Sequence, residues 1–268
     1  NPLQTSTFGT GLMIQHAMQS GAKEIILGLG GTATNDAGTG ILSALGFRFF
    51  DKDQHELQPN GQSLSLICSI ELPASIPEIK FRLACDVTNP LYGKNGAACI
   101  YAPQKGASPE EVKELDKGLA HFSGLLSGIT GKSIHEIPGT GAAGGIAAGL
   151  MSFFQVEILK GIELVIDASN LYSAIGNAGL VITGEGKMDD QTKAGKVAGT
   201  IAKIASVNRV PCIAICGVNE LDQLSITQLG LDAVYAISEI AERPETSITR
   251  ASRYLQMMAT KIAGDHIH

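Results

Sequence analysis

Short apolar runs alternate with amphipathic stretches along most of the chain, and the alternation is most regular in the second half. Apolar runs typical of buried strands are separated there by stretches of helical periodicity. The pattern predicts strands at 180–182, 212–215 and 233–236, and helices at 192–205 and 247–262. Strands that alternate with helices in this way are typical of a doubly wound parallel sheet, so the fold class is predicted to be α/β.

The first half contains similar elements joined by longer, less regular loops. Strands are predicted at 24–27, 47–50, 80–84 and 97–101, and helices at 10–20, 40–45, 108–127 and 142–154. The third of these helices has the clearest start, because Ser108 is a preferred N-cap residue and Pro109 suits the first helical position. The change in regularity predicts a domain boundary near residue 175, which divides the chain into 1–175 and 176–268.

Glycine is unusually frequent, with 32 of 268 residues, well above the average of about 7%. The glycines gather at 28–40, 93–106, 139–149 and 184–195. Glycines inside the predicted helix at 142–154 each destabilise it by about 1 kcal/mol relative to alanine, so another part of the structure must approach that backbone closely. The clusters predict several binding loops that converge on one cleft.

The segment 180–196 (L-V-I-T-G-E-G-K-M-D-D-Q-T-K-A-G-K) carries the most chemistry. A buried strand is expected to end at Thr183, followed by a glycine turn that opens into a helix. Amides at such a corner favour anions, and carboxylates favour a divalent cation or a hydroxyl proton. This corner therefore predicts phosphoryl transfer from a metal nucleotide. The residues proposed for it are Gly184, Glu185, Gly186, Lys187, Asp189 and Gln191.

The first glycine loop allows a second interpretation. Gly28, Gly30 and Ala33 fit G-x-G-x-x-A after a strand, and Asp51 stands 21 residues after Gly30, where a ribose-binding acid is expected. The pattern is compatible with an NAD(P)-dependent oxidoreductase. The loop is more polar than a dinucleotide turn, however, and Asp36 would repel a pyrophosphate unless a metal intervened. Asp36 could also be only an N-cap.

Two further loops place polar residues after predicted strands. Asp86 follows the predicted strand at 80–84, and Asn89-Pro90 then indicates a turn. Lys105 lies between a predicted strand and a predicted helix. Asp86 could serve only an Asx-turn, and Lys105 could be only a solvated lysine. No P-loop pattern is present, and the histidines show no metal-ligand spacing.

Composition limits the function classes. The net charge of −6 argues against nonspecific nucleic-acid binding, and no apolar run reaches the length of a membrane span. The five cysteines form no C-x-x-C pair and are expected to be reduced, which favours a cytoplasmic protein. A homodimer is compatible with the sequence.

Five ordered islands together resemble the class I glycerate kinase family. They are G-L-G-G-T-A-T-N-D-A-G (28–38), A-C-D-V-T-N-P-L-Y-G-K-N-G-A-A (84–98), P-Q-K-G-A (103–107), P-G-T-G-A-A-G-G (138–145) and V-I-T-G-E-G-K-M-D-D-Q-T (181–192). Thr32 stands where serine is usual in the family, and Ala37 where glycine is usual. Family members begin with a strand, an aspartate-serine-lysine loop and a D-G-G-E-G loop, which this sequence lacks.

The resemblance implies phosphorylation of D-glycerate by ATP and Mg²⁺, with the 2-phosphate favoured. It also implies two α/β domains around a cleft: a middle domain at 1–175, and a discontinuous Rossmann-like domain whose C-terminal half is 176–268. Part of that domain's parallel sheet and part of the active site are then expected to be missing from this sequence at its N-terminal side.

Roles follow from combining the resemblance with the motifs. Asp189 is the first candidate for metal contact or for accepting the hydroxyl proton, and Asp36 and Asp86 come next. Phosphates or the substrate carboxylate are expected to meet residues of the glycine loops and two lysines: Gly30, Gly31, Thr32, Thr34, Asn35, Asn89, Lys105, Gly184, Glu185, Gly186, Lys187 and Gln191. The alternatives are the oxidoreductase and a metabolite-binding module without turnover.

Overall fold

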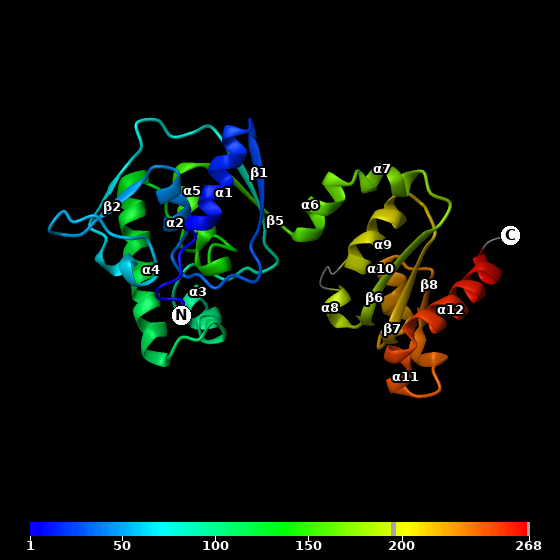
Figure 1. Cartoon of the computed structure of the whole chain (residues 1–268). Coiled ribbons are helices and arrows are strands. Elements are labelled where there is room, and N and C mark those ends of the chain that lie inside the picture. The colour runs from blue at the N-terminus through cyan, green and yellow to red at the C-terminus, as the bar shows by residue number, and fades with distance from the viewer. Residues whose placement is uncertain (194–196, 267–268) are drawn as a thin grey trace. The chain divides into compact units, whose positions relative to one another are not determined.

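The computed structural model describes residues 1–193 and 197–266, apart from the side chains of Gln191 and Pro244. The chain forms two compact units, Asn1–Gly161 and Ile162–His268 (Figure 1). The sequence placed the boundary near residue 175, but the helices before that point contribute Ile166 and Ile175 to the core of the second unit. Both units combine helices with a parallel sheet, which confirms the predicted α/β class.

The first unit is built on a three-stranded parallel sheet in the order β1-β4-β5. Its strands and helices are α1 (Phe8–Gln19), β1 (Glu24–Gly28), α2 (Thr39–Ala44), β2 (Arg48–Phe50), β3 (Ser69–Glu71), β4 (Lys80–Ala84), α3 (Ala97–Tyr101), α4 (Pro109–Thr130), α5 (Ile146–Phe153) and β5 (Gln155–Leu159). The register pairs Gly28 with Ala84 and Ala84 with Leu159, so the three strands end level with one another. Loops that leave these ends are therefore held close together.

The core of the first unit lies on one face of this sheet. Phe81 and Leu83 of β4 are fully buried there, and the Phe81 ring lies 5.3 Å from that of Phe154. The opposite face is charged, since Lys80 pairs with Glu157 at 3.0 Å across the strands. A sheet with one apolar and one polar face follows from the alternation of side chains along each strand.

Helix α4 begins as the sequence predicted. Ser108 accepts a hydrogen bond from the Glu111 amide, and the Glu111 side chain accepts one from the Ser108 amide, which makes a complete capping box. The helix ends at Gly131, whose φ of 68° is in the left-handed region. It buries Leu119 and Phe122 against the core.

Two glycines inside α4 make a matched pair for mutagenesis. A methyl group on the exposed Gly124 would meet no atom within 4 Å, whereas one on the buried Gly118 would lie 3.1 Å from Leu64 Cβ. We expect Gly124→Ala to raise the free energy of unfolding by about 1 kcal/mol, because alanine favours the helix. Gly118→Ala should give less than that gain or destabilise the protein. Urea denaturation of both variants measures the difference, and equal gains would contradict the packing.

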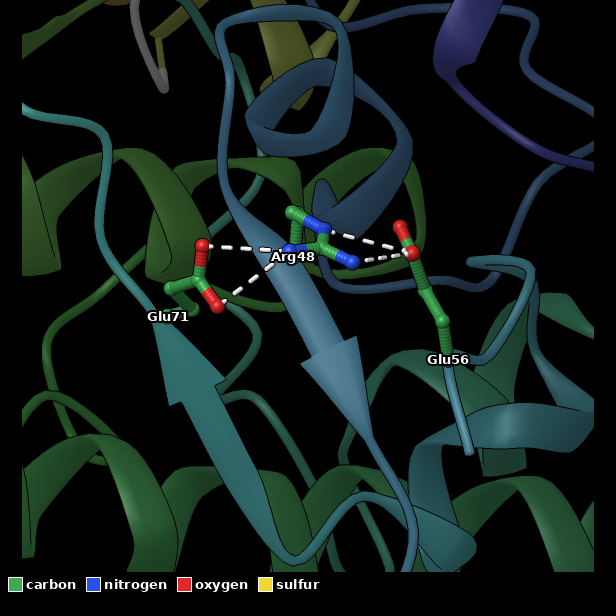
Figure 2. A network of polar contacts seen from close by, with 3 residues as sticks. All are labelled: Arg48, Glu56 and Glu71. Atoms are coloured by element: carbon green, nitrogen blue, oxygen red, sulfur yellow. Dashed lines mark hydrogen bonds and ion pairs between the residues drawn. The ribbon is translucent and has the colours of Figure 1, made fainter. Parts of the chain in front are cut away.

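The antiparallel pair β2–β3 stands apart from this sheet. Arg48 of β2 lies between two glutamates, with hydrogen bonds to Glu71 of β3 and to Glu56 of the loop that joins β2 to β3 (Figure 2). These acids raise the pKa of Arg48, and Arg48 lowers the pKa of Glu56. All three side chains are about half exposed, so the network orients the loop more than it stabilises the fold.

The second unit contains the predicted parallel sheet, in the order β6-β7-β8. Its elements are α6 (Gly161–Ala168, which starts at the boundary), α7 (Leu171–Gly176), β6 (Val181–Met188), α8 (Asp190–Lys193), α9 (Val197–Val207), β7 (Cys212–Asn219), α10 (Gln223–Leu229), β8 (Ala233–Ala236), α11 (Pro244–Thr249) and α12 (Ala251–His266). One core cluster packs α9 and α10 on the sheet, and another packs α12 on it. No helix in the described parts of the chain is long and apolar enough to cross a membrane.

Two sequence predictions of secondary structure are wrong. Ala97–Tyr101 was expected to be a strand but forms the helix α3. A five-residue apolar run is compatible with either a strand or a helix. The two alanines of this segment favour the helix. The strand predicted to end at Thr183 continues to Met188 as an edge strand, and Ile182 is 52% exposed. Gly184 and Gly186 are therefore strand residues, not a turn; a methyl group on Gly184 would lie 3.0 Å from Ile215 O of β7.

Candidate active site

The loop at 29–38 leaves the carboxyl end of β1 and leads to α2. Its polar residues differ in exposure: Asn35 and Asp36 are completely buried, whereas Thr32 and Thr34 are partly exposed. Both polar atoms of the Asn35 side chain and the Thr34 hydroxyl are buried without a hydrogen-bond partner in the described structure. Unsatisfied buried polar groups are uncommon, and they often mark a site for water or a ligand.

Asp36 joins the starts of two helices. Its carboxylate accepts hydrogen bonds from the Thr7 amide at 2.7 Å, the Thr7 hydroxyl at 2.8 Å, the Gly38 amide at 3.1 Å and the Gly40 amide at 3.3 Å. Thr7 precedes α1, and Gly38 precedes α2. Burial raises the pKa of the Asp36 carboxyl, while these hydrogen bonds act in the opposite direction. A negative charge near two helix N-termini is favourable. Asp36 is not itself the N-cap residue of either helix, since Thr7 and Gly38 hold those positions, but its carboxylate binds the amides of both.

The glycine-rich segment at 139–149 lies directly against this loop. Methyl groups on Gly144 and Gly149 would overlap Thr34 O and Ala37 O, and one on Gly141 would overlap Pro90 O. These contacts confirm that another backbone approaches the segment closely. Ala37 itself has φ of 51° and donates its amide to Gly144 O at 3.0 Å. That left-handed conformation suits glycine, which the resemblance gives as the usual residue there.

A cavity of about 220 Å³ opens where these loops meet. The residues around it come from the loop after β1, the loop after β4, the segment after α3 and the segment before α5: Leu29, Gly30, Gly31, Thr32, Val87, Tyr101, Gln104, Lys105, Ala142 and Ala143. Three of the four glycine clusters thus supply or flank one cavity. The fourth, at 184–195, belongs to the second unit.

Lys105 is the cation of this cavity. It ends a short 3₁₀ helix, Pro103–Lys105, and its ammonium group donates to Thr34 O at 2.7 Å and to Thr32 Oγ1 at 3.5 Å. Burial lowers the pKa of Lys105 to about 8, while the charge of Asp36 opposes this shift. Lys105 forms no ion pair within the described residues. The lysine is therefore partly desolvated and bonded only to neutral acceptors.

Asn89 and Asp86 lie beside the cavity and do not line it. Asn89 Oδ1 accepts a hydrogen bond of 2.6 Å from the Tyr101 hydroxyl, and Asn89 Nδ2 donates to Asn95 O at 2.8 Å. Asp86 is exposed, and its carboxylate accepts the Gly161 amide at 3.0 Å. Tyr101 was not among the predicted site residues, because the segment 97–101 was interpreted as a strand.

In the second unit, the predicted residues lie along β6. The Glu185 carboxylate accepts the Ala198 amide at 3.1 Å, at the start of α9. Lys187 pairs with Glu220 at 2.8 Å, and these contacts raise the pKa of Lys187. Glu220 follows directly after β7, and the sequence gave no signal for it beyond that position. Charged groups of both signs therefore gather at the carboxyl ends of two neighbouring parallel strands.

Asp189 follows β6 at this same end. One of its carboxylate oxygens lies 4.0 Å from Lys187 Nζ, and its amide donates to Thr192 Oγ1 at 3.2 Å. Its side chain is 22% exposed, so solutes can reach it. Gln191 is the second residue of α8, but its side chain lies outside the described structure.

Comparison with known proteins identifies the family. A sequence model described as the glycerate kinase family matches residues 1–266. The chain belongs to the glycerate kinase family. A glycerate kinase of Bacillus cereus is 41% identical over 98% of this chain and 70% of its own length. Glycerate 2-kinase of Escherichia coli K12 is 42% identical over 88% of this chain and 63% of its own length.

A solved structure agrees with this assignment. The crystal structure described as glycerate kinase 2 from Salmonella typhimurium LT2 superposes with a TM-score of 0.77 at 40% identity, over 88% of this chain and 62% of that chain. The resemblance and the kinase class predicted from the five islands are therefore confirmed. The chain spans about 70% of the length of the Bacillus cereus relative.

The oxidoreductase alternative is wrong, and the geometry gives the reason. A dinucleotide fingerprint needs a helix that starts at its glycines and an acid at the end of a neighbouring strand. In this glycerate kinase family member the loop continues to Thr39 before a helix begins. Asp51 follows β2, which pairs with β3 outside the sheet of β1. Its carboxylate instead binds the amides of Asp53 and His55 in an exposed turn.

Among the described residues, three potential metal ligands lie close together in this same turn. Ligand atoms of Asp51, Asp53 and His55 lie within 4.8 Å of one another. The hydrogen bonds of the turn explain this arrangement without an ion. Asp189, the predicted metal ligand, is not part of that cluster.

Proposed function

We propose that the protein transfers the γ-phosphoryl group of ATP, in the presence of Mg²⁺, to the 2-hydroxyl of D-glycerate. The observation that carries the proposal is the match to the glycerate kinase family along residues 1–266. The relative from Escherichia coli is named a glycerate 2-kinase, which supports the 2-phosphate as product. The partners are then two small molecules, with no nucleic acid, and the five free cysteines support a cytoplasmic location.

The first unit supplies binding groups for anions. Gly30, Gly31 and Thr32 border the cavity together with Lys105. Thr34 and Asn35, in the same loop as these three residues, hold buried polar atoms. Asp36 acts as a positioning residue in this proposal, because its carboxylate is enclosed by the amides and hydroxyl that it binds.

Asp189 and Lys187 are the proposed reactive groups of the second unit. Phosphoryl transfer depends on positioning and charge neutralisation more than on covalent chemistry. The Asp189 carboxylate is partly exposed at the end of a parallel strand, where it can accept a hydroxyl proton. Lys187, held by Glu220, offsets phosphate charge. Glu185 orients the start of α9. Gly184 lets β6 lie close to Ile215 O of β7, and Gly217 of β7 lies close to Gly186 O.

The donor set at this strand end fits Mg²⁺. Carboxylate oxygens are the ligands that Mg²⁺ prefers, and it is usually bound by one or two carboxylates together with substrate phosphates. As the alternative to accepting the hydroxyl proton, Asp189 would hold the ion, with Glu220 on the neighbouring strand end as the other nearby carboxylate. When bound, the ion neutralises charge on the nucleotide phosphates.

The product distinguishes 2-phosphorylation from 3-phosphorylation. Enolase converts 2-phosphoglycerate directly to phosphoenolpyruvate, but it does not act on 3-phosphoglycerate without a mutase. We expect full-length enzyme with D-glycerate, ATP and Mg²⁺ to give phosphoenolpyruvate when enolase alone is added. Product that requires the mutase would assign the 3-hydroxyl. A chelator added in excess over Mg²⁺ should stop ADP formation, measured directly by chromatography because enolase itself requires Mg²⁺. Full ADP formation with chelator would refute the role of the ion.

A further inference from the structure

The cavity of the first unit holds a cation without a charged partner. Lys105 Nζ donates to a carbonyl and a hydroxyl, and no carboxylate of the described residues lies within 4 Å of it. A buried or half-buried charge is unfavourable unless it is paired. An anion in the cavity would supply the missing partner.

Backbone amides beside Lys105 also favour an anion in the cavity. Gly30, Gly31 and Thr32 border the cavity in succession, and their amides donate to no acceptor in the part of the chain that the structure describes. Gly31 has φ of 65°, in the left-handed region. Successive amides around such a residue form a concave site that favours anions.

The size of the cavity distinguishes between the two anionic substrates. At about 220 Å³, it is smaller than the roughly 300–1,000 Å³ of sites for drug-sized ligands. A nucleotide exceeds this space, whereas a three-carbon acid fits it. Ala142 and Ala143 come from a segment whose backbone packs against the Thr34–Ala37 loop, so this wall cannot easily retreat.

We infer that this cavity binds the carboxylate of the three-carbon hydroxy acid, with Lys105 as its cationic partner, and that the nucleotide binds outside it. The inference rests on the proposed function and assigns one of its two substrates to one set of residues. A carboxylate and a phosphate would both suit Lys105, so the test compares them directly.

Two variants of the full-length protein test the assignment by calorimetric titration with D-glycerate, ATP and inorganic phosphate. Lys105→Met removes the charged ammonium group and keeps an unbranched apolar side chain of nearly the same length. Gly30→Ala adds a methyl group that meets no protein atom within 4 Å, so the fold should persist while the cavity shrinks. We expect Lys105→Met to weaken D-glycerate binding by about 10- to 100-fold, the range for losing a hydrogen bond to a charged group. Gly30→Ala should weaken it as well, because the added methyl group takes up space beside the bound acid. ATP binding should change by less than about threefold.

Matched controls use the same substitutions on the surface of α4, where Lys117 and Gly124 are exposed. Lys117→Met and Gly124→Ala should leave D-glycerate binding unchanged. The inference is overturned if the unaltered protein does not bind D-glycerate, if both folded variants bind it normally, or if ATP or phosphate binding weakens as much as D-glycerate binding. If D-glycerate binds as expected but the unaltered enzyme releases no ADP, the proposed function fails and the cavity assignment stands.

Discussion

Asp36→Ala is expected to destabilise the protein by about 3–5 kcal/mol, close to the effect of removing one partner from a buried charged pair. Alanine would leave four donors without an acceptor: the Thr7 amide and hydroxyl and the amides of Gly38 and Gly40. Each buried donor left unsatisfied carries a desolvation penalty of about 1–3 kcal/mol, and relaxation around the small side chain recovers part of the sum. Urea denaturation measures the loss.

Asp36→Asn is the matched control. Asparagine keeps the shape and one acceptor oxygen, but its amide group meets donors where the second oxygen was. Its loss of stability should therefore fall between wild type and Asp36→Ala. A loss below about 1 kcal/mol for Asp36→Ala would contradict the role that the hydrogen bonds assign, and would return Asp36 to the candidates for direct contact with substrate.

Asp189→Asn is expected to lower kcat by roughly 100-fold or more, the range for removing a general acid–base group. The substitution preserves size and the hydrogen bond from the residue 189 amide to Thr192, so stability should change little. The substitution removes the negative charge and replaces one acceptor oxygen by an amide group, at the strand end where Lys187 also lies. Steady-state kinetics of the full-length enzyme, together with thermal denaturation, separate the two effects.

The neighbouring acid provides the control for Asp189. The Asp190 side chain is 93% exposed and pairs with Lys193 at 3.0 Å on the surface of α8. Asp190→Asn should keep kcat within about twofold of wild type, because an exposed ion pair contributes little. Equal losses in both variants, or near-normal kcat in Asp189→Asn, would leave Asp189 with only a role in local structure.

The sequence predicted most elements because their boundaries have local causes. The strand at 80–84 was predicted with its observed bounds, and the capping box at Ser108 fixed the start of α4. The second half follows strand–helix alternation and forms the parallel sheet that this pattern indicates. Its glycines misled the prediction for β6, because glycine marks both turns and strands in close contact, and only the pairing with β7 separates the two.

The site was harder to predict because its residues act through distant partners. Nothing near Asp36 in the sequence indicates that Thr7 will bind its carboxylate. Tyr101 reaches the cavity only because 97–101 is a helix, and the environment of Lys105 depends on a loop about 70 residues earlier. The sequence therefore identified the loops and most of their polar residues, while their division into capping, orienting and binding groups required the tertiary contacts.

Release of ADP tests the central claim most directly. The full-length enzyme is incubated with ATP, Mg²⁺ and D-glycerate, and ADP is followed through pyruvate kinase and lactate dehydrogenase. In a separate assay without coupling enzymes, NAD⁺ or NADP⁺ replaces ATP. The account predicts ADP formation that depends on D-glycerate, with no reduction of either nicotinamide cofactor. Reduction of NAD⁺ or NADP⁺ by D-glycerate, without ADP formation, would contradict it.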